Sequence, residues 1–329
     1  MTSHILGRTA RSVSAIGLGT WQLGGDWGTV DDGDARAVLD ASLEAGVTMY
    51  DTADVYGDGR SESRIGAWRT DRGLGDSIFV ATKMGRRVAL DTANYTLANF
   101  REWTDRSRRN LAVDTLDLVQ LHCPPEGVFA SDEVFDALDT LVAEQVITAY
   151  GVSVETTAQA LASIARPGVA TVQIVLNAFR LKPLDEVLPA AAAAGVGVIA
   201  RIPLASGLLS GRYDHDTQFA ADDHRSYNRD GSSFDAGETF SGVDYDDGVE
   251  AAREFSALAR EHGLEPAAAA IAWLTQIPGV STVIPGARNV DQARRNAAAG
   301  SVAPLGPEFT AAVRDLYDRR LRAAVHDRW

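Results

Sequence analysis

"TVQIVLNAFRLKPLDEVLPAAAAAGVGVIAR", residues 171–201, joins two short apolar runs through an amphipathic one. The flanking runs, 171–177 and 195–201, are rich in valine and isoleucine and have the length of buried strands. The middle run, 183–195, has apolar residues at spacings of three and four and ends in glycine, which is typical of a helix with a left-handed C-terminal stop. This order predicts two parallel strands joined by a crossover helix.

The same alternation continues along the whole chain. Further strands are predicted at 14–21, 47–52, 77–84, 116–122, 147–153 and 280–286. Further helices are predicted at 31–46, 96–113, 131–144 and 156–166. Apolar strands separated by helices indicate a parallel sheet covered on both faces, and eight of them in 329 residues predict a (β/α)₈ TIM barrel, a single domain over 1–329. An open doubly wound sheet is the alternative, but the chain has no GxGxxG turn.

One region interrupts this alternation. Residues 212–248 are rich in aspartate and glycine and carry scattered aromatic residues without periodicity. Long loops in compact domains are usually either disordered or functional. The segment, which follows the seventh predicted strand, is therefore either a mobile surface insertion or a lid over a bound ligand.

Charge and cysteine content narrow the classes of function. The net charge is −14 and the pI is near 4.8, which disfavours a nucleic-acid face or an anionic membrane surface as a partner. Cys123 is the single cysteine, which excludes an intrachain disulfide and fits a reducing compartment, so we expect the cytoplasm. No run approaches the roughly 18 apolar residues of a membrane span. The six histidines show no paired metal-ligand spacing, so no metal site is expected.

Four polar side chains follow predicted strands at the end where barrel chemistry is found. They are Asp51 and Tyr56 after the second strand, Lys83 at the end of the third and His122 at the end of the fourth. Taken singly, Asp51 could be a helix cap, Tyr56 packing and His122 a satisfied core histidine. Lys83 is one of two lysines in the chain, and its burial would cost several kcal/mol without a partner such as Asp51.

Together, the four residues predict acid–base chemistry on a carbonyl group. A cation beside Tyr56 favours the phenolate, so Lys83 is expected to lower the pKa of Tyr56 and make it a general acid. His122 could then hydrogen-bond a substrate oxygen while the carbonyl carbon accepts a hydride from a bound cofactor.

The chain resembles the aldo-keto reductase family, in particular its bacterial and potassium-channel β-subunit branch. The resemblance covers nearly the whole length through motifs in the family's order, which are "GLGTW" (17–21), "YDTADVYG" (50–57), "ATKMG" (81–85), "LVQLHCP" (118–124), "YGVS" (150–153), "PLASGLLSGRY" (203–213) and "IPGARNVDQARRN" (284–296). It implies a catalytic tetrad of Asp51, Tyr56, Lys83 and His122. In that branch the segment after "GLLSGRY" folds over the dinucleotide, which favours a lid at 212–248.

The resemblance also implies NADP(H), with NAD(H) as the alternative, bound across the barrel mouth. Ser153 and Gln173 would hold the nicotinamide carboxamide, and Arg201, which stands where relatives often carry an aromatic residue, could stack on its ring. Arg288, at the start of a helix, would take a 2′-phosphate. The full set of expected cofactor residues is Gly19, Thr20, Trp21, Asp51, Ser153, Gln173, Arg201, Pro203, Leu204, Gly207, Leu208, Ser210, Arg212, Pro285, Gly286, Arg288, Gln292 and Asn296.

A mostly apolar wall with one cation is expected around the substrate. Its candidates are Trp21, Trp27, Val55, Met84, Arg86 and Cys123. Such a wall is compatible with aldehydes, ketones or small sugars that carry an anionic group.

The leading hypothesis is an enzyme, an NADP(H)-dependent reductase of aldehydes or ketones. Oxidation of a sugar or polyol is the alternative direction, with Tyr56 accepting the proton. A regulatory protein that senses redox state by binding NADP(H), with little turnover, is an alternative that is not primarily an enzyme. A metal-dependent barrel hydrolase is less favoured.

Overall fold

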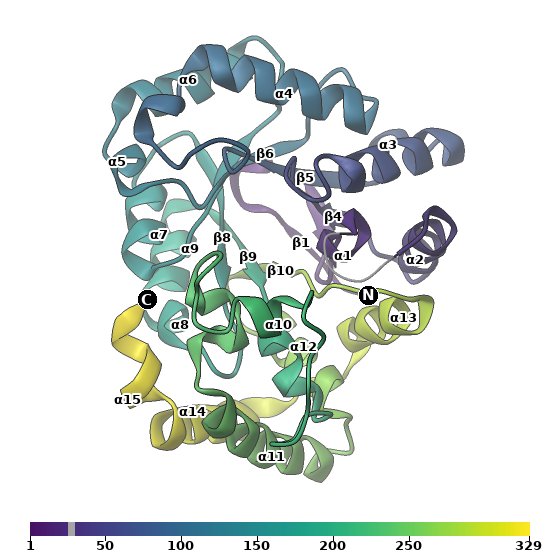
Figure 1. Ribbon diagram of the computed structural model, residues 1–329, viewed down its shortest axis with the longest axis vertical. Coiled ribbons are helices and arrows are strands. Elements are labelled where there is room, and N and C mark those ends of the chain that lie inside the picture. The colour runs from purple at the N-terminus through teal and green to yellow at the C-terminus, as the bar shows by residue number, and fades with distance from the viewer. Residues whose placement is uncertain (26–29) are drawn as a thin grey trace.

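The computed structural model describes residues 1–25 and 30–329, and its centre is a parallel sheet of eight strands in chain order (Figure 1). The strands are β3 (Leu18–Gly19), β4 (Met49–Asp51), β5 (Phe79–Met84), β6 (Leu118–His122), β7 (Tyr150–Ser153), β8 (Val169–Val175), β9 (Gly197–Arg201) and β10 (Val280–Val283). The sheet closes on itself through parallel bridges from Ile16 to Val283 and from Gly19 to Gly286. The predicted TIM barrel is confirmed.

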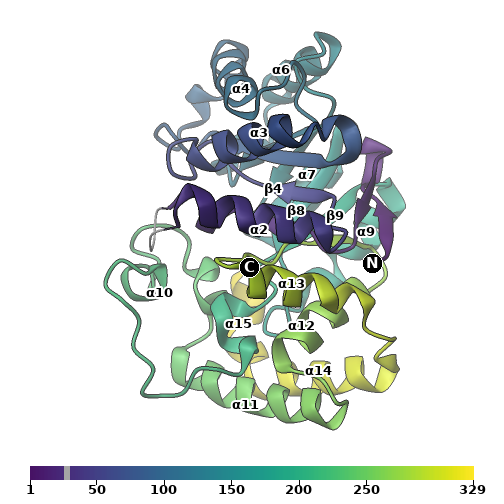
Figure 2. The ribbon, with the colours of Figure 1, turned by 90° about the vertical axis from the view of Figure 1, so that its right-hand side faces the viewer.

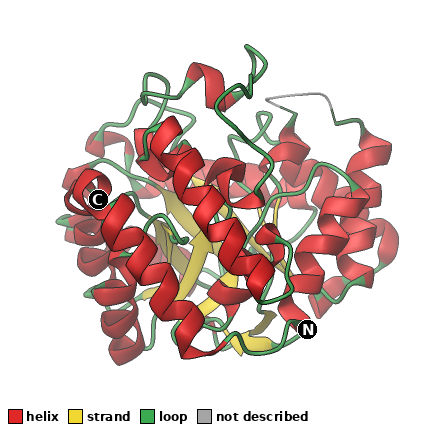
Figure 3. Cartoon of the chain, turned by 90° about the horizontal axis from the view of Figure 1, so that it is seen from below, coloured by secondary structure: helices red, strands yellow, loops and turns green. Residues whose placement is uncertain are grey.

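Helices surround the strands, as the red ring around the yellow sheet shows in Figure 3. The helices are α1 (Trp21–Gly24), α2 (Asp32–Glu44), α3 (Arg60–Arg72), α4 (Leu97–Leu111), α5 (Glu126–Phe129), α6 (Asp132–Ala143), α7 (Thr157–Ile164), α8 (Lys182–Asp185), α9 (Val187–Ala194), α10 (His224–Tyr227), α11 (Tyr245–Glu261), α12 (Pro266–Thr275), α13 (Val290–Ala298), α14 (Gly306–Arg320) and α15 (Arg322–Val325). Within the described ranges, none of these helices combines the length and the apolar character that a bilayer span requires.

Local sequence explains where several helices begin and end. Asp31, Thr96 and Ser131 cap α2, α4 and α6 with side-chain oxygens. At the start of α7, Thr156 and Gln159 form a reciprocal capping box. Glycines in the left-handed conformation end α3 and α9.

Two differences from the sequence prediction are larger than a shift of two or three residues at the end of a strand. The first barrel strand spans only Leu18–Gly19 instead of 14–21, because Trp21 already begins α1. The single helix predicted at 183–195 is divided into α8 and α9 at Glu186. Pro189 explains this break, since a proline ring in a helix clashes with the carbonyl four residues earlier, here that of Asp185.

Strand alternation divides the apolar residues into two layers. One layer fills the barrel interior and includes Met49, Phe79, Ala81, Leu118 and Ile199. The other layer packs between the strands and the helices, and Val80 and Met84 of β5 belong to it. The odd and even positions of a strand therefore have different environments, and polar residues that share the phase of Phe79 and Ala81 lie inside the barrel.

An antiparallel hairpin, which the sequence analysis did not predict, covers one end of the barrel. Its strands are β1 (Ser3–Ile5) and β2 (Ser12–Ser14). Leu6 and Val13, both 0% exposed, join the interior layer from this hairpin. In Figure 2 the hairpin (purple) and α10 lie at opposite sides of the molecule, so residues 212–248 lie toward the other end of the barrel.

Residues 212–248 fold into an ordered cover made of turns and short helices. It contains α10 and two 3₁₀ turns, Ala236–Glu238 and Phe240–Gly242. Asn177, just after β8, donates a hydrogen bond of 2.7 Å to Ser241, and the backbone amide of Phe240 donates one of 3.0 Å to Ser206. These contacts fix the segment, called the lid below, to the loops that follow β8 and β9.

Leu6 provides a test of the hairpin's contribution to stability. Leu6→Ala leaves a cavity in the barrel interior and should lower the free energy of unfolding by about 2–5 kcal/mol. Ile5→Ala is the matched control, because Ile5 is 59% exposed and should change stability by less than about 1 kcal/mol. Urea unfolding measures both, and equal effects would contradict the interior role of Leu6.

Candidate active site

A buried ion pair lies at the carboxyl ends of β4 and β5. Lys83 Nζ lies 2.5 Å from Asp51 Oδ1 and donates a second hydrogen bond of 2.8 Å to the Thr52 carbonyl. Lys83 is 1% exposed and Asp51 is 3% exposed. Burial lowers the pKa of Lys83, but Asp51 and Tyr56 raise it by more than burial lowers it. The net pKa is therefore raised, and the ammonium is charged.

Tyr56 lies on the turn after β4, with its hydroxyl 3.5 Å from Lys83 Nζ. Gly57, at φ +61°, makes this turn possible, because a Cβ there would lie 2.1 Å from the Gly24 carbonyl oxygen. Burial raises the pKa of Tyr56 and Lys83 lowers it, and the net pKa is raised. The expectation that Lys83 brings the pKa of Tyr56 below its usual value is therefore wrong, because burial outweighs the nearby charge.

His122 ends β6 and completes the group. Its ring is perpendicular to that of Tyr56, with 5.9 Å between the ring centroids. Burial, followed by the charges of Arg86, Lys83 and Arg201, holds the pKa of His122 well below its ordinary value. His122 is therefore neutral, and one of its ring nitrogens can donate a hydrogen bond. The structure thus brings together all four residues that the sequence placed at strand ends.

The second oxygen of Asp51 is held from two further strands. Gln173 on β8 donates to Asp51 Oδ2 at 2.7 Å, and Gln120 on β6 does so at 3.4 Å. The sequence analysis missed Gln120, although its position two residues before His122 gives it the same inward phase. Gln173 was expected to hold the nicotinamide carboxamide. In the structure its amide nitrogen donates to Asp51 instead and positions that carboxylate.

Other expected cofactor residues lie at the strand ends across the barrel. Ser153 pairs in register with His122 on one side and with Gln173 on the other. The loop after β9 contains Pro203, Leu204, Leu208 and Ser210, and its backbone is strained. Ile202, Ala205, Ser206 and Gly207 all have positive φ, which is uncommon for residues other than glycine.

The start of α13 offers a site for an anion. The side chain of Gln292 accepts from the backbone amide of Arg288 at 2.8 Å, and that of Asn296 donates to the Gly286 carbonyl at 3.1 Å. Both side chains therefore brace the loop between β10 and α13. Arg288 precedes the helix and Arg212 is exposed beyond the β9 loop. A helix N-terminus preceded by an arginine has the character of a phosphate-binding site.

Next to this loop, Gly19 donates its backbone amide to the Pro285 carbonyl at 3.1 Å, and Thr20 donates its hydroxyl to the Asp51 carbonyl at 2.8 Å. The expected residues of the first strand thus lie between the tetrad and the β10 loop.

A sequence model of the Aldo/keto reductase family matches residues 15–318. The chain belongs to this family.

Individual proteins are similar to this chain over nearly their whole length. A probable voltage-gated potassium channel subunit beta of Oryza sativa is 30% identical, covering 91% of both chains. A glycerol dehydrogenase of Gluconobacter oxydans superposes with a TM-score of 0.78 at 30% identity, covering 97% of this chain and 96% of that one. An aldo-keto reductase of Klebsiella pneumoniae, solved in complex with NADPH, gives 0.70 at 26% identity, with 96% of both chains covered.

Trp21, one of the residues expected at the substrate, packs against the lid. The ring centroid of Trp21 lies 6.2 Å from Tyr56, 5.1 Å from His224 and 6.1 Å from Phe234, and the last two residues belong to the lid. Trp27 lies outside the described residues. Val55 is half-buried beside Tyr56. The sequence analysis missed His224 and Phe234, since nothing in the aperiodic lid marks either residue.

Two expectations about this wall are corrected. Met84 does not face the site, because it is 1% exposed and belongs to the layer between strands and helices. The wall is also not mostly apolar, because Arg86 forms an ion pair with Glu155 at 2.9 Å and Arg201 forms one with Glu238 of the lid. Cys123 lies among these charges, 3.6 Å from Ser153 Oγ.

Asp54 is a buried carboxyl group behind the tetrad. It is 1% exposed, and its Oδ1 is a buried atom without a hydrogen-bond partner in the described structure. Its backbone amide donates to the Lys83 carbonyl at 3.1 Å. Burial, followed by the charge of the buried Glu62, raises the pKa of Asp54 to about 7.

This raised pKa makes stability depend on pH. The pKa of Asp54 is higher in the folded than in the unfolded chain, so between pH 4 and 7 the folded state binds more protons and stability falls as pH rises. Asp54→Asn should therefore raise the free energy of unfolding at pH 8, by up to about 4 kcal/mol, and change it little at pH 4.

Urea unfolding at pH 4.5 and pH 8 measures this difference. Asp136→Asn, an exposed substitution on α6, is the control and should leave the pH dependence unchanged. An Asp54→Asn variant that keeps the wild-type slope would contradict the assignment.

Proposed function

We propose that this chain is an NADP(H)-dependent oxidoreductase that reduces aldehydes or ketones to alcohols. The observation that carries the proposal is the Tyr56 hydroxyl next to a charged, buried Lys83 and beside a neutral His122. Family membership supports the reaction class, and the Klebsiella relative solved with NADPH supports the cofactor.

Each residue of the tetrad has a separate role in the reduction of the carbonyl group. When bound, NADP(H) supplies the hydride that reduces the carbonyl carbon. His122, being neutral, donates a hydrogen bond to the carbonyl oxygen and orients it toward Tyr56. Tyr56 gives its proton to that oxygen as negative charge develops there, and the alcohol forms. Lys83 stabilises the phenolate that remains, and Asp51 keeps Lys83 charged and in place.

This division does not require a low pKa for Tyr56 at rest. The Lys83 charge acts mainly once the phenolate forms, because an ion pair in a buried site is stronger than one in water. The neutral hydroxyl remains protonated near neutral pH, which is the form that a proton donor needs.

Oxidation of an alcohol is the second candidate, and the similarity to a glycerol dehydrogenase favours it. In that direction Tyr56 would accept the proton. A third candidate is an NADP(H)-binding sensor with little turnover, for which the rice channel subunit is the relevant relative. A reductase would turn over NADPH with a carbonyl compound, and an alcohol dehydrogenase would turn over NADP⁺ with an alcohol. A sensor would bind the cofactor without turnover.

Tyr56→Phe tests the proton donor. It removes only the hydroxyl, so kcat for reduction should fall by about 10²–10⁴-fold while NADPH binding, followed by fluorescence, persists. Tyr50→Phe is the matched control, because the Tyr50 hydroxyl contacts the Val47 carbonyl at 3.4 Å in the outer layer. The measurement is NADPH consumption against a panel of aldehydes and ketones. Tight binding without wild-type turnover in either direction would favour the sensor and overturn the reductase.

Arg288→Leu tests the cofactor preference. If Arg288 holds a 2′-phosphate, the substitution should raise KM for NADPH by about tenfold or more and leave KM for NADH nearly unchanged. Arg294→Leu is the control, because Arg294 is exposed on α13 and pairs with Glu44. Equal changes for the two cofactors would contradict recognition of the 2′-phosphate.

A further inference from the structure

Two arginines and two glutamates surround the substrate side of His122. Arg86 follows β5, Arg201 ends β9 and Glu155 follows β7. Glu238 belongs to the lid and forms the second ion pair, with Arg201. Arg86 Nε donates to the His122 carbonyl and Arg201 Nη2 lies 4.0 Å from Cys123 Sγ, so the two arginines contact neighbouring residues at the barrel mouth.

Arg86 is held in a fixed orientation with donors left over. Its Nε donates to the His122 carbonyl at 3.1 Å, and its Nη2 donates to Glu155 at 2.9 Å. In the described structure, Nη1 has no hydrogen-bond acceptor and is not among the buried atoms that lack a partner, so it is accessible. The guanidinium group is therefore anchored beside the catalytic histidine and can still bind an anion.

Arg201 is more deeply buried, and its main counter-ion comes from the lid. Its Nη2 donates to the Val154 carbonyl at 3.0 Å, while its Nη1 pairs with Glu238. Its Nε is buried and has no partner among the described residues. Arg201 is 7% exposed, so removing Glu238 without a replacement would leave a buried cation poorly compensated.

Glu238 depends on the lid for its position. The Glu238 carbonyl accepts a hydrogen bond of 3.0 Å from the Ser206 hydroxyl.

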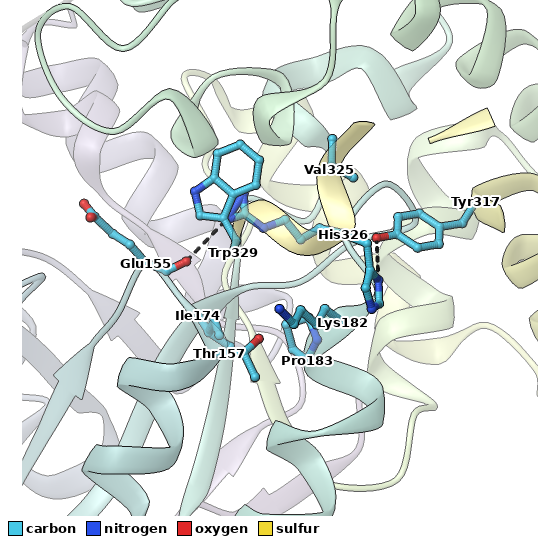
Figure 4. A pocket seen from close by; sticks show the side chains of 10 residues that line it. Glu155, Thr157, Ile174, Lys182, Pro183, Tyr317, Val325, His326 and Trp329 are labelled. Carbon is cyan, nitrogen blue, oxygen red and sulfur yellow. Dashed lines mark hydrogen bonds between the residues drawn. The ribbon is translucent and has the colours of Figure 1, made fainter. Parts of the chain in front are cut away.

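Glu155 is anchored through its backbone, because Arg180 donates to the Glu155 carbonyl at 3.2 Å. The Arg180 guanidinium also lies 3.9 Å from the ring centroid of Trp329. A cavity of about 10 Å³ lies beside this contact and is lined in part by Glu155 and Trp329 (Figure 4). That volume admits about one water molecule and is too small for a carboxylate.

We propose, on the basis of the proposed function, that Arg86 and Arg201 select carbonyl substrates that carry a carboxylate, and that Glu238 takes the place of that carboxylate when no substrate is bound. Arg86 Nη1 is free to donate to a carboxylate, and Arg201 Nη1 can donate to one in place of Glu238, so each guanidinium contributes one charge-assisted hydrogen bond. Since Arg86 contacts the His122 carbonyl, the substrate's carboxylate and its reacting carbonyl are separated by only a few carbon atoms.

The test compares two aldehydes of equal chain length, 4-oxobutanoate and butanal, with NADPH. We expect kcat/KM of the wild type to be at least roughly tenfold higher for the anion. Arg86→Met should lower the ratio of the two values by about tenfold or more. Arg87→Met is the matched control, because the neighbouring Arg87 pairs with exposed Asp58 and should keep the wild-type ratio.

Glu238→Gln gives a second, opposite readout that does not depend on the folding of Arg86→Met. Removing the competing carboxylate should raise the ratio by lowering KM for 4-oxobutanoate. A binding measurement without turnover completes the test: succinate should raise the melting temperature of the wild type and not that of Arg86→Met.

The possible outcomes separate this inference from the proposed function. Turnover of both aldehydes without preference for the anion, or an equal loss of both in Arg86→Met, would overturn the anion site and leave the reductase standing. Absence of NADPH-dependent turnover of any carbonyl compound would overturn the reductase itself.

Discussion

The buried pair of Asp51 and Lys83 is the interaction on which the site depends. A lone ammonium in the barrel interior would lose its charge. Asp51 raises the pKa of Lys83 and keeps it charged, and Gln120 and Gln173 satisfy the second carboxylate oxygen of Asp51. The cation that faces Tyr56 therefore exists only because four strands deliver polar atoms to one point.

The sequence predicted the barrel because its strands are buried on both faces. Strands of this kind appear as short valine- and isoleucine-rich runs, and 171–177 and 195–201 stand out for that reason. The hairpin at Ser3–Ile5 and Ser12–Ser14 did not stand out, because three-residue strands with polar side chains give no periodic signal. Pro189 could have indicated the break before α9.

The candidate tetrad was predictable because chemistry in such barrels lies at the strand ends. The inward or outward phase of each residue was not used, and Met84 was misplaced as a result, although Lys83 next to it fixes the phase of β5. Glu238 could not have been found, since its contact with Arg201 depends on how the lid folds over the mouth. The sign of the net pKa shift of Tyr56 likewise depends on burial, which the sequence does not give.

The bond from Gln173 to Asp51 joins residues 122 positions apart in the chain. The tetrad residues belong to the first half of the barrel, whereas Gln173, which holds Asp51, belongs to the second half. Lys83 and Gln120 hold the same carboxylate from the first half, so Asp51 is joined to both halves of the closed barrel. The surroundings of Asp51 would therefore change if the two halves of the barrel separated.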